Sequence, residues 1–118
     1  MQHFQDCFYD LTDAINEHNV EIYQYVGDEA VLTWKVEEGL KDKTATYSTS
    51  KKNFYLKAAK KIKKAFPECT LISDVAMDPY SSDGHDGYVQ NGEILNDETL
   101  PILAAMSVAQ AEAGFDIL

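Results

Sequence analysis

The sequence predicts an α/β fold, and three observations carry this prediction. Residues 70–73 form a short apolar run typical of a buried strand, and this run leads into a loop rich in carboxylates. Helical patterns precede and follow this unit, and residues 115–118 have the composition of a further strand. A strand, a helix and a strand in this order imply a parallel, right-handed pair. We expect this pair and an earlier hairpin to share one mixed sheet, with helices on one face.

Composition limits the class of protein. The chain has 118 residues, 45% hydrophobic and 25% charged, which suits one small globular domain. Its net charge is -10, its ends are acidic and it has no arginine, so we expect no nucleic-acid partner. No apolar run approaches the roughly 20 residues that span a bilayer, and no signal peptide is recognisable, so we expect no membrane partner. Cys7 and Cys69 form no CxxC pair, which favours reduced thiols in a cytoplasmic protein.

The first third of the chain predicts a helix followed by a β-hairpin. Apolar residues recur at helical spacing over residues 2–18. Two runs rich in β-branched and aromatic residues, 20–26 and 30–36, flank Gly27 and Asp28. A glycine and an aspartate between such runs are typical of a tight hairpin turn.

A polar segment without periodicity, residues 37–52, reads as a linker. Asn53 is then expected to cap a helix that ends before Pro67. The helix has one apolar stripe, and its lysines form a solvated face. The predicted stripe consists of Tyr55, Ala58, Ala59, Ile62, Ala65 and Phe66.

The last part of the chain predicts a strand at residues 69–75, a hairpin that turns at Asn91 and Gly92, and a long helix. The helix is expected to begin near Asp97, with Pro101 in its first turn, and to end at Gly114. Its predicted buried stripe consists of Leu100, Leu103, Ala104, Ser107, Val108 and Ala111.

The carboxylate loop, residues 74–87, is the candidate site. Asp74 follows the predicted strand, where α/β enzymes often place catalytic groups. Asp78 and Asp86 are hard oxygen donors that suit Mg²⁺ better than zinc, and His85 could bind a metal or move protons. The alternative is a solvated turn in which each acid caps nearby backbone donors. The residues alone leave both interpretations open.

The amino-acid sequence of this loop resembles that of a known enzyme family. SDVAMDPYSSDGHDG at residues 73–87, NGEILNDET at 91–99 and AQAEAG at 109–114 are similar to porphobilinogen synthases (5-aminolevulinate dehydratases). The resemblance covers about residues 42–118. It implies part of a (β/α)8 TIM barrel, as helix, strand, loop, helix and strand. It also implies condensation of two 5-aminolevulinate molecules in heme and other tetrapyrrole biosynthesis, by a homo-oligomer.

The same resemblance implies roles for single residues. Asp74 matches an active-site aspartate, and Tyr80, Ser81, Ser82 and His85 belong to the region near the active-site lid. Zinc-dependent members carry three cysteines in this loop, at the positions of Ala76, Asp78 and Asp86 here. This pattern implies Mg²⁺ at Asp78 and Asp86, and no zinc. The family's active-site lysines match no residue here, so we expect no synthase activity from the 118-residue chain alone.

The first part of the chain resembles a different family. DCFYDLTDAI at residues 6–15 and EIYQYVGDEAVLTW at 21–34 are similar to class III adenylate/guanylate cyclases, with Asp28 at the position of a metal-binding aspartate. The resulting domain prediction is a cyclase-like part (1–40), a junction (41–52) and a synthase-like part (53–118). A fragment of a cyclase that makes cyclic AMP or GMP, and a non-catalytic α/β oligomerising module, are the alternative functions.

Overall fold

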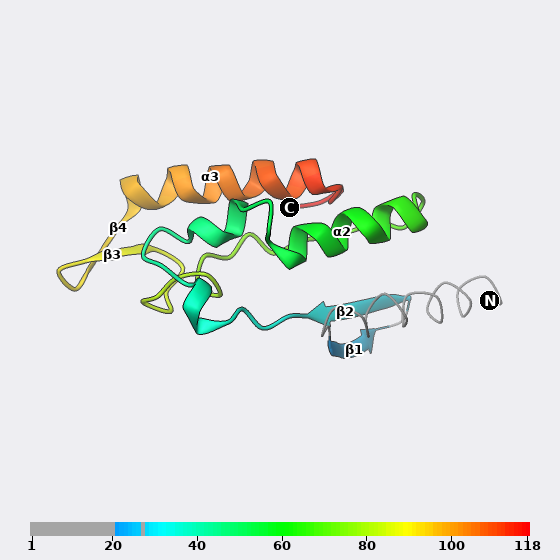
Figure 1. The fold of residues 1–118 in the computed structure, drawn as a ribbon, viewed down its shortest axis with the longest axis horizontal. Helices are drawn as coiled ribbons and strands as arrows, with labels where there is room; N and C mark the ends of the chain where they lie inside the picture. The colour runs from blue at the N-terminus through cyan, green and yellow to red at the C-terminus, as the bar shows by residue number, and fades with distance from the viewer. Residues whose placement is uncertain (1–20, 27) are drawn as a thin grey trace.

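The computed structural model describes residues 21–26 and 28–118, and the predicted helix at residues 2–18 lies outside them. Its elements in chain order are β1 (Glu21–Val26), β2 (Glu29–Thr33), η1 (Glu38–Leu40), η2 (Thr46–Thr49), α2 (Phe54–Ala65), β3 (Tyr88–Gln90), β4 (Glu93–Leu95) and α3 (Asn96–Ala113). Helices α2 and α3 lie side by side, and the β1–β2 hairpin lies on the other side of α2 (Figure 1). The predicted α/β class is confirmed.

Among residues 21–26 and 28–118, the strands form two separate hairpins. β1 pairs with β2, and β3 pairs with β4, both antiparallel as predicted. The β3–β4 turn has Asn91 at φ 53° and Gly92 at φ 81°, the left-handed geometry that a two-residue turn of this type requires. Residue 27 is outside the described residues, so the predicted geometry of the first turn stays a prediction.

The predicted mixed sheet is wrong for the described residues, because the parallel pair is only a single bridge between Ile72 and Ile117. Ser73 N donates to Ile117 O at 3.0 Å, and Asp116 N donates to Leu71 O at 2.8 Å. Beyond Ser73 the chain is held by side chains of the two helices instead of a second strand. The pairing is parallel as predicted, but it is too short to join the hairpins.

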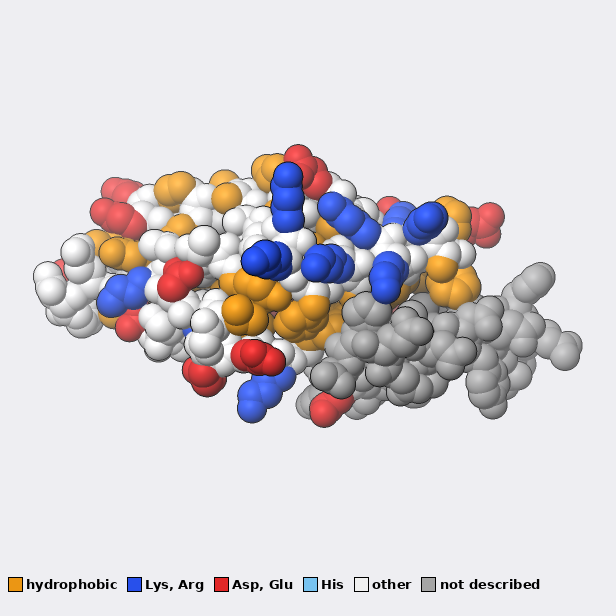
Figure 2. All heavy atoms as spheres, viewed as in Figure 1, with side chains coloured by type: hydrophobic (Ala, Val, Ile, Leu, Met, Phe, Trp, Pro, Cys, Tyr) orange, Lys and Arg blue, Asp and Glu red, His pale blue; other side chains and the backbone are white. Residues whose placement is uncertain are grey.

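Helix α2 follows its predicted pattern. The Asn53 side chain accepts a hydrogen bond from Tyr55 N, which caps the helix, and the helix ends before Pro67. The buried residues include three of the predicted stripe, while Ala65 is exposed and Leu56 is buried in addition. Figure 2 shows lysine side chains gathered above a band of hydrophobic side chains on this face of the molecule.

Helix α3 differs from its prediction in its start and in its buried face. It begins at Asn96 without a side-chain cap, so Pro101 is the sixth helical residue instead of a first-turn residue. The early start follows from β4, which runs directly into the helix. Within the first turn, the Thr99 hydroxyl donates to Leu95 O and accepts from Tyr88 N.

The predicted stripe of α3 is largely exposed. Leu100 is 63% exposed and Val108 58% exposed, whereas the buried residues are Thr99, Met106, Gln110 and Ala113. The reason is that α3 is apolar around most of its circumference, so periodicity does not identify the packed face. In the described part of the chain, no helix is both long and apolar enough to cross a membrane.

The main core joins α3 to the carboxylate loop. Met106 of α3, 1% exposed, packs in one cluster with Met77 and Tyr80 of the loop and with Val36 and Ala45. The predicted linker therefore contributes Ala45 to the core, although most of its residues are exposed. A second cluster places Leu32 and Trp34, from β2 and the residues that follow it, against α2.

Candidate functional site

The carboxylate loop is anchored by two of its own side chains. Met77 is fully buried and Tyr80 is 7% exposed. Between them the backbone makes a tight turn, in which Tyr80 N and Ser81 N both donate to Met77 O at 3.0 Å. The turn presents Asp78 at the surface, while Met77 and Tyr80 are held in the core.

Asp86 closes the loop onto this turn. Its Oδ1 accepts hydrogen bonds from Met77 N at 2.9 Å and from Asp78 N at 3.2 Å. Burial, followed by the charge and hydrogen bond of Asp86 and the charge of Asp74, raises the pKa of Asp78 above its ordinary value. The structure therefore brings together the three predicted acids, Asp74, Asp78 and Asp86.

Asp74 is exposed, and both helices position the backbone next to it. Tyr55 of α2 and Ser73 form a hydroxyl–hydroxyl hydrogen bond of 2.7 Å. Gln110 of α3 donates from Nε2 to Asp74 O at 3.3 Å. These contacts leave the Asp74 carboxylate at the surface, where its charge contributes to the raised pKa of Asp78.

The predicted lid residues divide into two kinds. Tyr80 and Ser81 are buried and hold the loop, whereas Ser82 and His85 are exposed. The His85 ring stays close to the loop, because its Nδ1 accepts a hydrogen bond from Gly87 N at 3.1 Å. Ser82 and His85 are therefore the two lid candidates that a ligand could reach.

Residues 42–46 clamp the loop from the side, and sequence reasoning missed them as functional support. Asp42 N donates to Tyr80 O, and Ser82 N donates to Asp42 O, both at 3.1 Å. The Asp42 carboxylate accepts hydrogen bonds from Thr44 and Thr46. Burial opposes its ionisation, but these bonds outweigh burial and hold the pKa of Asp42 below its ordinary value. An aspartate followed by threonines two and four residues later was the available signal.

Lys43 adds a second tie between the clamp and the loop. Its Nζ lies 3.3 Å from Asp83 Oδ2 and donates to Val89 O at 3.1 Å. The pair is partly exposed, so its contribution to stability is small. Its position still links the clamp to the loop at Asp83 and to β3 at Val89.

The other predicted metal residue, Asp28, is exposed in the β1–β2 turn. It is not among the groups that shift the pKa of Asp78. Within the described residues, no group of three or more His, Cys, Asp or Glu side chains is arranged to hold a metal ion. The loop offers the paired carboxylates of Asp78 and Asp86, and the hairpin offers Asp28 as its predicted metal residue.

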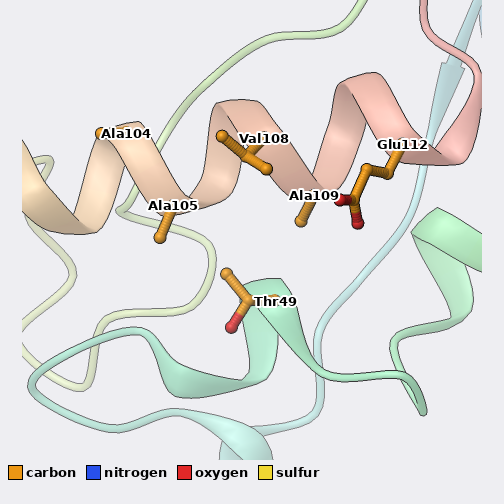
Figure 3. Close-up of a pocket in the computed structure, with 6 residues that line it drawn as sticks. All are labelled: Thr49, Ala104, Ala105, Val108, Ala109 and Glu112. Atoms are coloured by element: carbon orange, nitrogen blue, oxygen red, sulfur yellow. The ribbon is translucent and has the colours of Figure 1, made fainter.

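A shallow groove lies elsewhere, between η2 and α3. It encloses about 460 Å³ and is lined by Thr49, Ala104, Ala105, Val108, Ala109 and Glu112. Figure 3 shows Ala105 and Ala109 pointing from α3 towards Thr49. None of the loop acids lines this groove, so it is separate from the candidate site.

Comparison with known proteins supports the resemblance of the loop. The profile of the family described as Delta-aminolevulinic acid dehydratase matches residues 4–118. The delta-aminolevulinic acid dehydratase of Chlamydia pneumoniae is 45% identical over 83 residues, which are 70% of this chain and 25% of that protein. The chloroplastic enzyme of Chlamydomonas reinhardtii is 39% identical over 103 residues, which are 86% of this chain and 26% of that protein.

A solved structure agrees with these relatives. Delta-aminolevulinic acid dehydratase from Toxoplasma gondii ME49, in complex with the reaction product porphobilinogen, matches with a TM-score of 0.67 and 42% identity. The match covers 70% of this chain and 24% of that chain. The present chain thus spans about a quarter of the length of its relatives.

The family match also bears on the first part of the chain. Its range of residues 4–118 includes residues 4–40, for which a cyclase resemblance was noted, and it includes the predicted junction. The named relatives are dehydratases, and they give no support to a cyclase fragment or to a non-catalytic module. On this evidence the chain belongs to the delta-aminolevulinic acid dehydratase (porphobilinogen synthase) family.

Proposed function

We propose that this chain supplies the carboxylate-bearing part of a porphobilinogen synthase site, in a lyase that condenses two 5-aminolevulinate molecules. The observation that carries the proposal is the grouping of Asp74, Asp78 and Asp86 on a loop whose neighbouring residues are locked into the core. A solvated turn, the alternative interpretation, does not require a fully buried Met77. The proposed reaction is inferred from the family, and the proposed location of the site is inferred from the loop.

We propose further that the chain is a segment of a (β/α)8 barrel. The order α2, residues 71–73, carboxylate loop, α3 and residues 116–118 follows the helix, strand, loop, helix and strand of such a barrel. The parallel bridge between Ile72 and Ile117 supports this reading, because neighbouring barrel strands are parallel. The loop then lies after the carboxyl end of its strand, where barrel enzymes place their catalytic groups.

In this proposal Asp74 is the catalytic carboxylate of the segment. It directly follows the bridged strand, its carboxylate is exposed, and two helices fix its backbone. Ser82 and His85 lie on the exposed part of the loop and act as lid residues, whereas Tyr80 and Ser81 anchor it.

We propose Mg²⁺ as the metal of the loop, held by Asp78 and Asp86. Their donor set fits this ion, because carboxylate oxygens suit Mg²⁺ and a pair suffices when water completes the shell. Burial first, and then the neighbouring acids Asp86 and Asp74, raise the pKa of Asp78, and a bound cation would favour its charged form against both effects. Zinc fits less well, since the loop has no cysteine.

A segment exchange tests the function. The matching segment of the Chlamydia pneumoniae relative would be replaced by residues 42–118, and porphobilinogen formation would be measured colorimetrically. We expect an active chimera, and loss of about 100-fold or more in kcat for Asp74→Asn. Asp97→Asn, an exposed acid at the start of α3, is the matched control and should leave kcat unchanged. An active chimera that tolerates Asp74→Asn would contradict the role of Asp74.

The isolated 118-residue chain is expected to form no porphobilinogen in the same assay, because the lysines implied by the resemblance match none of its residues. Turnover by the purified chain would overturn this expectation.

We also propose that the chain acts in the cytoplasm and forms a homo-oligomer. Support for an oligomer comes from the exposed apolar face of α3 at Leu100 and Val108. Sedimentation of a Leu100→Lys, Val108→Lys variant as a smaller species than the wild type would support it.

A further inference from the structure

Asn53 is buried with no exposed surface, and its side chain joins three segments of the chain. Its Oδ1 accepts a hydrogen bond from Tyr55 N at 3.0 Å, at the start of α2. Its Nδ2 donates to Ser48 O at 3.0 Å in η2 and to Tyr80 Oη at 3.3 Å in the carboxylate loop. All three groups of the amide that can make hydrogen bonds are therefore engaged.

Helix capping alone does not explain this residue. A serine, threonine or aspartate would accept the hydrogen bond from the backbone equally well. Among these side chains only the amide supplies two donors beside its acceptor oxygen, and both donors of Asn53 bond outside α2, to Ser48 and Tyr80. An asparagine at this position therefore makes the hydrogen bonds to η2 and to the carboxylate loop in addition to the helix cap.

Tyr80 connects Asn53 with the turn of the candidate site. Its ring is buried beside Tyr47, with the ring centroids 6.3 Å apart. Its backbone N donates to Met77 O, and its backbone O accepts from Asp42 N. A fixed Tyr80 thus fixes the turn on which Asp78 stands and the contact of this turn with the clamp.

We propose that Asn53 is a positioning residue of the carboxylate loop: its side-chain amide orients Tyr80, and Tyr80 holds the turn that presents Asp78. Asn53 touches no reacting group and acts only through Tyr80. The importance of the loop for catalysis rests on the proposed function, but the coupling itself rests on the described contacts alone.

Two variants separate the amide donor from the cap. Asn53→Asp keeps the oxygen that accepts from Tyr55 N and removes the donors to Ser48 and to Tyr80. Tyr80→Phe removes the hydroxyl acceptor and leaves the cap intact. Ser50→Ala is the matched control, because it removes the acceptor for Lys52 N just before α2 and makes no contact with Tyr80.

Amide hydrogen exchange, measured by NMR without metal or substrate, distinguishes an effect on the carboxylate loop from an effect on the cap of α2. The amides of Met77 and Ser81 report on the loop, and those of Lys57 and Phe66 report on α2. We expect Asn53→Asp and Tyr80→Phe each to speed exchange in the loop by about three- to tenfold, and the double variant to add little to either. Exchange in α2 should change by less than about twofold in all variants, including Ser50→Ala.

The opposite pattern would overturn the proposal. If Asn53→Asp speeds exchange in α2 but leaves Met77 and Ser81 unchanged, Asn53 is only a cap. If Tyr80→Phe leaves the loop unchanged, the contact does not position it. Because exchange needs no activity, an inactive chimera would refute the proposed function without affecting this result.

Discussion

The carboxylate loop and the β1–β2 hairpin both carry acids where the chain reverses direction, but they differ in how they are packed. The loop inserts Met77 into the main core, and its acids lie close enough to shift the pKa of Asp78. The hairpin carries Asp28 on an exposed turn, and β2 alternates between exposed and half-buried residues. The comparison indicates that an acid in a turn becomes a candidate site when backbone donors and the core fix its position.

The two regions also differ in how they are attached. Hydrogen bonds from four residues outside it hold the loop, namely Asp42, Lys43, Asn53 and Gln110. The hairpin region docks through apolar contacts, chiefly Trp34, whose ring meets the Tyr55 ring edge-on at 5.1 Å. Substitutions in the two regions should therefore differ in their cost to the free energy of unfolding.

Truncation of Met77 should produce the largest loss. Met77→Ala removes a fully buried side chain and leaves a cavity, so we expect a loss of about 2–5 kcal/mol in the free energy of unfolding. Val31→Ala in β2 removes a side chain that is 37% exposed and should cost less than about 1 kcal/mol. Urea denaturation followed by circular dichroism compares the two. Equal losses would contradict the claim that the loop is more deeply anchored.

Trp34 should give an intermediate effect. Trp34→Ala removes its edge contact with Tyr55 and its packing on α2, for about 1–3 kcal/mol. The buried Nε1 of Trp34 has no hydrogen-bond partner among the described residues. Trp34→Phe keeps an aromatic ring and removes this donor, so its cost should be at least about 1 kcal/mol smaller than that of Trp34→Ala. A Phe variant as unstable as the Ala variant would show that the indole nitrogen is bonded after all.

Asp42 should give a smaller effect that depends on pH. Its folded-state pKa lies below the ordinary value of 3.8, so its ionised form stabilises the fold above that value. This stabilisation is lost as the pH falls through the folded-state pKa. We expect Asp42→Asn to cost about 1 kcal/mol at neutral pH and nothing once the wild-type carboxylate is protonated. Unfolding curves measured at neutral pH, and again at a pH below the folded-state pKa of Asp42, check this.

Asp83→Asn is the matched control for Asp42→Asn, because Asp83 belongs to the carboxylate loop but forms only a partly exposed pair with Lys43. Its cost should not exceed about 0.5 kcal/mol. If Asp83→Asn costs more than Asp42→Asn, the clamp holds the loop by its ion pair and not by the hydrogen bonds of Asp42.

Sequence reasoning succeeded where one signal dominated. Asn53 and Pro67 bounded α2, the lysines marked its exposed side, and Asn91 with Gly92 fixed the second hairpin turn. It failed for the packed face of α3, since a helix that is apolar around most of its circumference has no single preferred face. It also predicted a longer parallel strand than the structure has, because a β-rich composition does not show which partners a strand will find.

For the site, the sequence predicted the acids but not their support. The pattern of Asp74, Asp78 and Asp86 was visible because these residues carry the chemistry. The clamp lay in a polar segment without periodicity, where the hydrogen bonds of Asp42 arise only from the local turn and from contact with the loop. Tyr80 was expected at the lid, and its burial turns it into an anchor. Such tertiary contacts cannot be read from spacing along the chain.

The most direct test of the account is an Mg²⁺ titration of the chain by isothermal calorimetry. The account predicts binding at roughly millimolar concentrations, lost in Asp78→Asn and in Asp86→Asn and unchanged in Asp28→Asn. Amide exchange of Met77 would confirm that the loop of each variant is still formed. Binding that survives both loop substitutions, or that disappears only with Asp28→Asn, would contradict the assignment of the metal to the carboxylate loop.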